Sequence, residues 1–473
     1  MNLLIGLVIL LCLLCSELQA AQAANDLWTR VIFVALVTLT VPGVALFQTL
    51  VVSKRIRNSE MQSQEREGIL RRLAVCHSAV WLIASLAIVW AVRWQDVVRG
   101  NWSLDQWPVL DEAIILAPIV FSLVASWAIF YQIQHAIAGA NPDRSTESKK
   151  SIVKQSRAAF VSIRFRVYFL MVLVPVAIVV LARDVAPWVD TLSPELRWAL
   201  YGTAGLAMTG GFPFLLLLMW KTSHIENVAL KSELLETCKH HRLHVHDIRV
   251  WNTDNQIVNA LVAGVIPRLR VILMSDALIK CFPRNELLAI LRHEAGHLRL
   301  WHLPTRIGFC VLPLLALAID ERNAHGAIAN IDSMLVGAGL HAGTGLALIM
   351  LLYLFYAVYG LSWLSHQMEY EADIYASQQN ALDWTNVSSE TVEGNCFEHA
   401  SDMSDALLRL AAVNPDQIKK SSLLHPSIGS RIKVIQTVAT DPEQGIAFSK
   451  SFARRRRIIF SILITVCVVA FLS

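Results

Sequence analysis

Charged residues are scarce in this sequence. Lys, Arg, Asp and Glu make up 16% of its 473 residues, 55% are hydrophobic, and the mean hydropathy is +0.48. Soluble globular domains carry about 25% charged residues, so the composition excludes an ordinary soluble protein and indicates several membrane spans. The net charge of +4 says little by itself. The positions of the positive charges are more informative.

A cysteine framework is also missing. The eight Cys residues are scattered, and only Cys12 and Cys15 have C-x-x-C spacing, inside an apolar leader without a second pair. This pattern provides neither a cysteine zinc site nor a disulfide framework. We therefore interpret all eight as buried or incidental thiols.

Five apolar segments predict a multi-span membrane region of about five helices over residues 25–220. Most are near the roughly 20 residues that a helix needs to cross a bilayer. They are Val31–Val52, Leu73–Val92, Ala113–Ile133, Val167–Leu181 and Ala199–Trp220. Residues 1–24 are either a signal peptide or a first membrane span, since they end in a typical A-Q-A cleavage sequence but lack a basic start.

The loops between these segments alternate in charge. Basic residues dominate residues 54–72 and 144–166, whereas acidic residues outnumber basic ones at 93–112 and 183–197. The positive-inside rule then places everything after residue 220 in the cytoplasm. Four Arg residues at 454–457 precede an apolar tail, so we interpret residues 457–473 as a C-terminal membrane anchor and expect no nucleic-acid partner.

An H-E-A-G-H sequence at residues 293–297 is the strongest chemical signal. It lies in a stretch of helix formers that begins after Pro283, and on a helix His293 and His297 share one face, one turn apart. Two neutral imidazoles so placed can bind one tetrahedral Zn²⁺. Glu294 beside them is suited to act as the general base of a metalloprotease.

A catalytic zinc needs a third protein ligand, and an E-Y-E-A-D sequence at residues 369–373 provides a candidate. Glu369 and Asp373 are four residues apart, so a second helix can present both to the same point. We expect Glu369 to ligate zinc and Asp373 to hold a ligating imidazole through its other N–H. Glu371 is expected to lie on a solvated, acidic helix end.

Together these residues resemble the gluzincin membrane metallopeptidases, the family of the HtpX heat-shock protease and the type I CAAX prenyl protease. Two further stretches carry the resemblance, N-A at 259–260 with the segment 267–278, and H-P-S-I-G-S-R-I at 425–432. It covers about residues 247–435. It implies an α+β peptidase domain with one Zn²⁺ per chain, inside a mainly α-helical polytopic membrane protein.

The resemblance also implies a membrane hairpin inside the peptidase domain. Apolar runs at Ile307–Ala318 and Leu335–Leu364 flank a charged turn at residues 320–323. We therefore expect the first half of the domain at 221–302, the hairpin at 303–364 and the second half at 365–456.

Four more site residues follow from the resemblance. Asn259 and Ala260 match the strand that pairs with extended substrate, although a plain structural hairpin is an equal alternative. His425 and Arg431 match a stretch that faces the active site, where they would stabilise the oxyanion. The alternative for Arg431 is pairing with an acidic residue to lock the domain.

The most favoured function is a membrane zinc endopeptidase that acts on unfolded or membrane proteins in quality control. An intramembrane protease is disfavoured because the zinc helix carries Glu286, Arg292 and Arg299, and is therefore amphipathic. A transporter is disfavoured because the spans are nearly free of charge. Narrow CAAX-type processing and a zinc-binding inactive scaffold remain alternatives.

Four His residues near 240–246 are interpreted as solvated surface.

Overall fold

We describe the chain from a computed structural model. It describes residues 5, 6, 8, 9, 12, 13, 16, 23–58, 63–140, 156–255, 257–319, 330, 331, 333–338, 344–378, 397–413 and 415–472. The chain divides into two compact units. The first comprises Met1–Thr222 with Trp251–Ile257, and the second comprises Ser223–Val250 with Val258–Ser473. Most of the leader at 1–24 and the charged turn at 320–323 lie outside the described residues.

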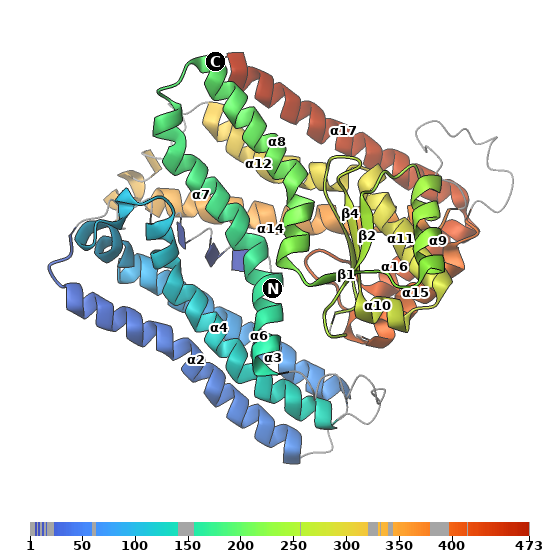
Figure 1. The fold of residues 1–473 in the computed structure, drawn as a ribbon, viewed down its shortest axis with the longest axis horizontal. Coiled ribbons are helices and arrows are strands. Elements are labelled where there is room, and N and C mark those ends of the chain that lie inside the picture. The colour runs from blue at the N-terminus through green and yellow to red at the C-terminus, as the bar shows by residue number, and fades with distance from the viewer. Residues whose placement is uncertain are drawn as a thin grey trace. The chain divides into compact units, whose positions relative to one another are not determined.

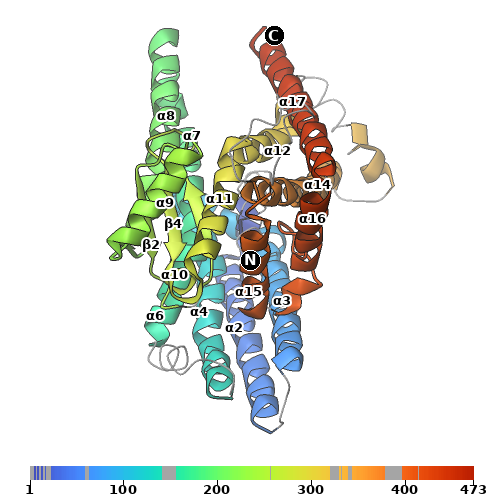
Figure 2. The ribbon, with the colours of Figure 1, turned by 90° about the vertical axis from the view of Figure 1, so that its right-hand side faces the viewer.

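The first unit is built from long apolar helices. They are α2 (Leu27–Asn58), α3 (Ser63–Leu86), α4 (Leu110–Ala140), α6 (Arg157–Arg164), α7 (Met171–Val189) and α8 (Pro194–Met219), with π-helical turns η1 (Ala87–Ala91), η2 (Asp96–Asn101) and η4 (Phe165–Leu170) and a 3-10 turn η3 (Leu104–Gln106). Helices α2, α3 and α4 run side by side (Figures 1 and 2). A buried apolar cluster around Trp81, Ile115 and Phe169 forms the core of this unit.

Helices of the first unit are long and apolar enough to cross a membrane at four of the five predicted segments. Four single helices meet that test, Leu27–Arg55, Gly68–Ala91, Leu110–Ile133 and Val172–Val189. The bent pair Glu195–Ala207 and Gly210–Met219 is a fifth if it counts as one span. The chain is therefore an integral membrane protein, and the prediction of a mainly α-helical polytopic fold is confirmed.

The second unit combines a small sheet with helices. Its elements are β1 (Thr222–His224), α9 (Val228–His240), β2 (Asp247–Trp251), β3 (Ala260–Ala263), β4 (Val271–Ser275), α10 (Asp276–Cys281), α11 (Arg284–Arg299), α12 (His302–Ile319), α14 (Thr344–Ala376), α15 (Ala400–Val413), the 3-10 turn η6 (Pro415–Ile418), α16 (Ile428–Thr440) and α17 (Pro442–Leu472). The strand order is β1-β2-β4-β3, so β3 is an edge strand. It pairs antiparallel with β4, with Ala260 opposite Met274.

Helix α11 packs against strand β3 and against helices α9, α14 and α15 (Figure 1). Leu287, Leu291 and Ala295 belong to the same buried cluster as the strand residues Ile248 and Ile272. The helix begins after Pro283, as predicted, and is buried on most of its faces.

Glu286 and Arg292 of α11 therefore form hydrogen bonds with other residues of the protein. Glu286 accepts two hydrogen bonds from Arg409, at 2.6 and 2.8 Å. Arg292 is buried and donates to the Ala376 carbonyl at 3.1 Å and to Asp402 at 3.3 Å. These residues thus fix the helix within a protein core, which the amphipathic pattern alone did not indicate.

Helices α14 and α17 are each continuous. Helix α14 extends without a break from the predicted second hairpin arm to Glu369 and Asp373. Helix α17 likewise continues from Pro442 through the Arg run into the apolar tail, and it packs along α12. The candidate spans identified among the described residues all precede Trp220, so the hairpin and the C-terminal anchor remain predictions.

Candidate active site

His293 and His297 direct their imidazoles at one point from a single helix face. Their Nε2 atoms are 3.1 Å apart. Glu369 approaches from α14, with Oε2 3.6 Å from His293 Nε2 and Oε1 3.4 Å from His297 Nε2. The fold thus brings together the three ligands proposed from the sequence, and one candidate ligand atom from each lies within 4.8 Å of the others.

This spacing fits a single tetrahedral metal ion. Metal–ligand bonds of about 2.0–2.2 Å at tetrahedral angles separate two ligand atoms by about 3.3–3.5 Å. The three separations given above scatter closely around that value. Two imidazoles and one carboxylate, with a fourth position left open, form a donor set used by catalytic zinc.

Asp373 and Arg431 support the His293 ring from behind. His293 Nδ1 lies 2.9 Å from Asp373 Oδ1. Arg431 donates two hydrogen bonds to that carboxylate, from Nε at 2.7 Å and Nη2 at 2.6 Å. This is the position expected for Asp373, next to the second ring nitrogen of a ligating histidine. It fixes which nitrogen of His293 faces the metal.

Arg431 itself lies behind the ligands. Its third nitrogen, Nη1, is 3.4 Å from Glu369 Oε2, and the side chain is buried. Its guanidinium contacts both Asp373 and Glu369. These contacts match the alternative for Arg431, an acidic partner that locks the domain, and its role toward an oxyanion stays a prediction.

His425 occupies the open side of the site. Its Nδ1 is 3.0 Å from Glu369 Oε2, and its side chain is 60% exposed. Its second ring nitrogen is thus available to solvent or substrate. Arg306 of α12 lies on the same carboxylate, with Nη2 3.8 Å from Glu369 Oε1. Arg306 carries no signal in the sequence, because its position beside Glu369 arises only from the tertiary fold.

The fold also places His302 next to His297, which the sequence analysis missed. His302 Nδ1 is 2.8 Å from His297 Nδ1, and His302 Nε2 is 3.0 Å from Glu371 Oε2. Glu371 is only 2% exposed and forms an ion pair with Arg456 of α17. The prediction of a solvated Glu371 is therefore wrong, because α11, α16 and α17 all pack against this end of α14. A third His five residues after His297 was the available signal.

Burial and hydrogen bonding shift the pKa values of the site residues in different directions. Desolvation raises the pKa of Glu294 to about 7, and the nearby Glu369 charge adds to the rise. Burial raises the pKa of Glu369, but hydrogen bonds to His293, His297 and His425 lower it by more. The net pKa is well below its ordinary value, so this carboxyl group is ionised. Burial lowers the pKa of His293, but hydrogen bonds to Asp373 and Glu369 raise it to about 9. A metal ion must therefore displace a proton from His293.

The two ligand-bearing helices are held in close contact at Gly296. A Cβ atom built there would lie 3.2 Å from the Ala372 Cα and 3.2 Å from Tyr375 Cδ1. Any larger residue would push α14 away from α11. The glycine of the H-E-A-G-H sequence thus sets the distance between the histidines and Glu369.

Asn259 and Ala260 lie at the start of the edge strand β3, which packs on α11. The Asn259 backbone N–H donates to Ser275 Oγ at 3.0 Å, and its carbonyl accepts from the Ser275 N–H at 2.9 Å. Asn259 is exposed, whereas Ala260 is buried. These backbone groups therefore face β4 and are already paired within the sheet. The substrate-binding role of Asn259 and Ala260 stays a prediction.

His241 is buried, although it was predicted to belong to a solvated cluster. It is 2% exposed, and its Nδ1 is 3.0 Å from the Tyr375 hydroxyl. Burial, together with the nearby positive charges, lowers the pKa of His241 to about 4. His240, His244 and His246 are exposed, as expected.

Residues 224–439 match the family model of peptidase family M48. The matched region covers slightly less than half of the chain, and it is similar to this family of metallopeptidases. The resemblance drawn from the sequence, to the membrane gluzincins, is thereby confirmed. A comparison with curated proteins finds no match. Among solved structures, the chain is similar to the crystal structure of Ste24p from S. mikatae, with 14% identity, 85% of this chain and 98% of that chain covered, and a TM-score of 0.34.

Proposed function

We propose that this protein is a zinc-dependent endopeptidase of the M48 type, with His293, His297 and Glu369 as ligands of one Zn²⁺. The separations of their ligand atoms, from 3.1 to 3.6 Å, carry the proposal. A zinc ion held there would polarise the scissile carbonyl and lower the pKa of a water molecule.

Glu294 is the general base in this proposal. Its carboxylate accepts a proton from the attacking water and later returns it to the leaving amine. A group that both takes and gives a proton works best with a pKa near the working pH, and burial raises the pKa of Glu294 to about 7.

His425 and Arg306 are the proposed oxyanion donors. Both lie beside Glu369, and Arg306 Nε and Nη2 are buried without a hydrogen-bond partner among the described residues. A buried cationic donor of this kind gains most from an anion that forms during the reaction.

The proposed substrate is an extended segment of an unfolded or membrane protein. The edge position of β3 supports backbone pairing, which tolerates many side chains and suits broad quality control. We further propose that the peptidase domain is cytoplasmic. The distribution of basic loops at 54–72 and 144–166 supports this orientation.

Cleavage of casein by the detergent-purified, zinc-loaded protein tests the proposal, with Glu294→Gln as the matched variant. We expect wild type to cut internal bonds, and Glu294→Gln to bind zinc equally but to cut at least about 100-fold more slowly, a typical loss for a general base. Equal zinc binding without cleavage by either protein would reject a broad-specificity endopeptidase and favour narrow processing or an inactive scaffold.

A further inference from the structure

We infer that His302, Glu371 and Arg456 form a support chain that holds His297 in the ring orientation needed for the metal, so that the C-terminal helix α17 is part of the active site. This inference rests on the metal site proposed above. It adds three positioning residues, none of which is a ligand or touches substrate.

The hydrogen-bond direction in this chain is fixed by the metal. If His297 gives its Nε2 lone pair to zinc, its Nδ1 carries the proton and donates. His302 Nδ1, 2.8 Å away, must then accept. A neutral His302 with an accepting Nδ1 carries its proton on Nε2, which lies 3.0 Å from Glu371 Oε2. The hydrogen bonds therefore run in one direction, from His297 to His302 and from His302 to Glu371.

Arg456 completes the chain at the far end. Its Nη1 forms an ion pair with Glu371 Oε2, and its side chain is 12% exposed. Glu371 and His302 are almost fully buried. A carboxyl group at such depth needs a partner of opposite charge, and Arg456 provides it while Glu371 Oε2 accepts from His302.

The two zinc histidines are thus supported in parallel ways. His293 contacts Asp373 directly, and Arg431 neutralises that carboxylate. His297 reaches its carboxylate through one additional imidazole. Trp301, with a φ of 58°, makes the tight turn between α11 and α12 that brings His302 back onto His297. A residue without glycine's freedom at positive φ stores strain, which is common next to functional sites.

The consequence is a link between α17 and the metal ligands. Arg456 belongs to a run of four Arg residues expected only to mark a membrane anchor, but it points into the protein, whereas Arg454, Arg455 and Arg457 are exposed. Displacement of α17 would therefore loosen His297.

Zinc affinity of full-length protein in detergent, measured by competition with a chromophoric chelator, tests this chain. We expect Arg456→Gln and His302→Phe each to weaken Zn²⁺ binding by about 10- to 100-fold, the usual effect of losing a partner behind a metal ligand. Arg457→Gln is the matched control, with the same charge change one residue along α17, and should bind like wild type.

Two further measurements separate positioning from a merely structural role. Arg456→Lys keeps the charge and should recover most of the affinity lost in Arg456→Gln. The visible spectrum of the Co²⁺-loaded protein should shift in His302→Phe and stay unchanged in Arg457→Gln. Wild-type affinity and spectrum in Arg456→Gln would overturn the inference. Absence of Zn²⁺ binding by wild type would instead reject the proposed function.

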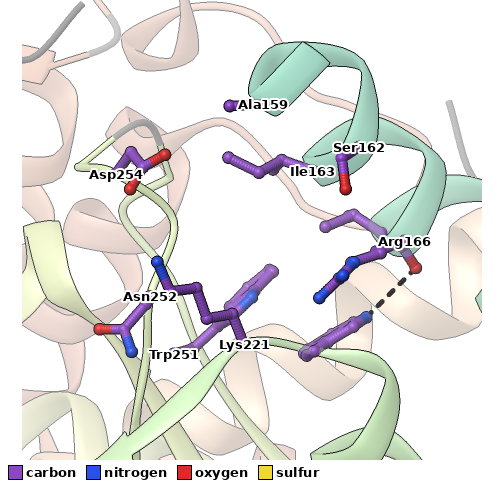
Figure 3. A pocket seen from close by; sticks show the side chains of 10 residues that line it. Ala159, Ser162, Ile163, Arg166, Lys221, Trp251, Asn252 and Asp254 are labelled. Atoms are coloured by element: carbon purple, nitrogen blue, oxygen red, sulfur yellow. Dashed lines mark hydrogen bonds between the residues drawn. The ribbon is translucent and has the colours of Figure 1, made fainter. Parts of the chain in front are cut away.

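An independent observation in the first unit supports a second proposal. A pocket of about 160 Å³ lies between α6, η4, the end of α8 and the segment after β2 (Figure 3). Trp220 and Trp251 stack at 4.2 Å on one side of it, and Trp220 Nε1 donates to the Arg166 carbonyl. The exposed cations Arg166 and Lys221 line it, together with the polar Ser162 and Asn252 and one acidic residue, Asp254.

This pocket lies at the ends of two candidate spans. Residues Val172–Val189 follow η4 directly, and Gly210–Met219 end just before Trp220. At such a boundary indole rings prefer the headgroup level, and paired cations between helices bind lipid phosphates. We propose that the pocket takes the phosphate of a phospholipid headgroup, with Arg166 and Lys221 as its partners.

Native mass spectrometry with added phosphatidylglycerol tests this site. The double variant Arg166→Gln, Lys221→Gln should lose about 10-fold in lipid affinity, whereas Arg157→Gln at the start of the adjoining helix α6 should match wild type. Equal binding by all three proteins would overturn the proposal. Complete displacement of the lipid by millimolar inorganic phosphate would overturn the lipid source, since a headgroup also gains from its acyl chains.

Discussion

At the scale of single residues, some members of the candidate site can be predicted from sequence patterns and others cannot. The roles of His293, His297 and Glu294 could be predicted because the two histidines are four residues apart on one helix and Glu294 lies beside them in the sequence. Glu369 requires a second helix but shares a motif with Asp373. Arg306, Arg409 and Arg456 carry no such signal, because their partners lie 63–123 residues away. His302 is close to His297 in sequence, but their contact requires the backbone reversal at Trp301.

The Asp373–Arg431 pair gives a prediction at this scale. Asp373→Asn leaves a buried guanidinium without its carboxylate, so we expect a loss of about 3–5 kcal/mol in the free energy of unfolding. Thermal unfolding of the purified protein measures it. In the double variant Asp373→Asn, Arg431→Gln the loss should be smaller than the sum of the single losses, and strict additivity would show that the two side chains do not interact.

His241 predicts a pH dependence. Its folded pKa is lowered to about 4, against an ordinary value of 6.5, so the unfolded chain binds more protons between these values. Stability is therefore complete above about pH 6.5 and falls as the pH decreases toward 4, by at most about 3 kcal/mol from this group. Unfolding of wild type and His241→Gln from pH 7 to pH 4 measures the difference. Identical pH slopes would contradict the assignment.

At the scale of elements, the contact between α11 and α14 decides the site. The sequence indicates both helices, and their ligands, but not that they approach so closely at Gly296. Nor does it show that α14 is one helix from the predicted hairpin arm to Asp373. Packing distance depends on side chains that meet only after folding, so a pattern of period 3.6 does not contain it.

Gly296→Ala tests this contact. The added methyl group would meet the Ala372 backbone, and overpacking of this kind costs about 1–3 kcal/mol. Because α14 carries Glu369, zinc affinity should fall together with stability. Gly202→Ala is the control, since nothing lies within 4 Å of its Cβ position. A Gly296→Ala protein with wild-type zinc affinity would show that the helix spacing does not set the ligand geometry.

At the scale of the whole molecule, composition and hydropathy indicated a membrane protein, and the helices of spanning length agree with it. The peptidase was indicated by the H-E-A-G-H sequence with its downstream partner, and the match of residues 224–439 to a peptidase family supports it. Four of the five apolar segments coincide with helices of spanning length, and the fifth coincides with a bent pair. The role of α17 was not predictable, because a run of Arg beside an apolar tail looks the same whether one of its side chains turns inward or none does.

Metal removal gives a prediction at this scale. If the site holds zinc in the folded state only, excess Zn²⁺ stabilises the protein by about 2.7 kcal/mol at a free concentration 100 times Kd. Removing zinc with a chelator should therefore lower the unfolding temperature, and returning zinc should restore it. In Glu369→Ala the unfolding temperature should not respond to zinc.

The zinc content per chain of the purified protein tests the central claim most directly. The account predicts one zinc ion in wild type and in Glu294→Gln, and almost none in His297→Ala and Glu369→Ala, since two remaining ligands hold the ion weakly. A wild-type zinc content in Glu369→Ala would contradict the ligand set that the fold brings together from α11 and α14.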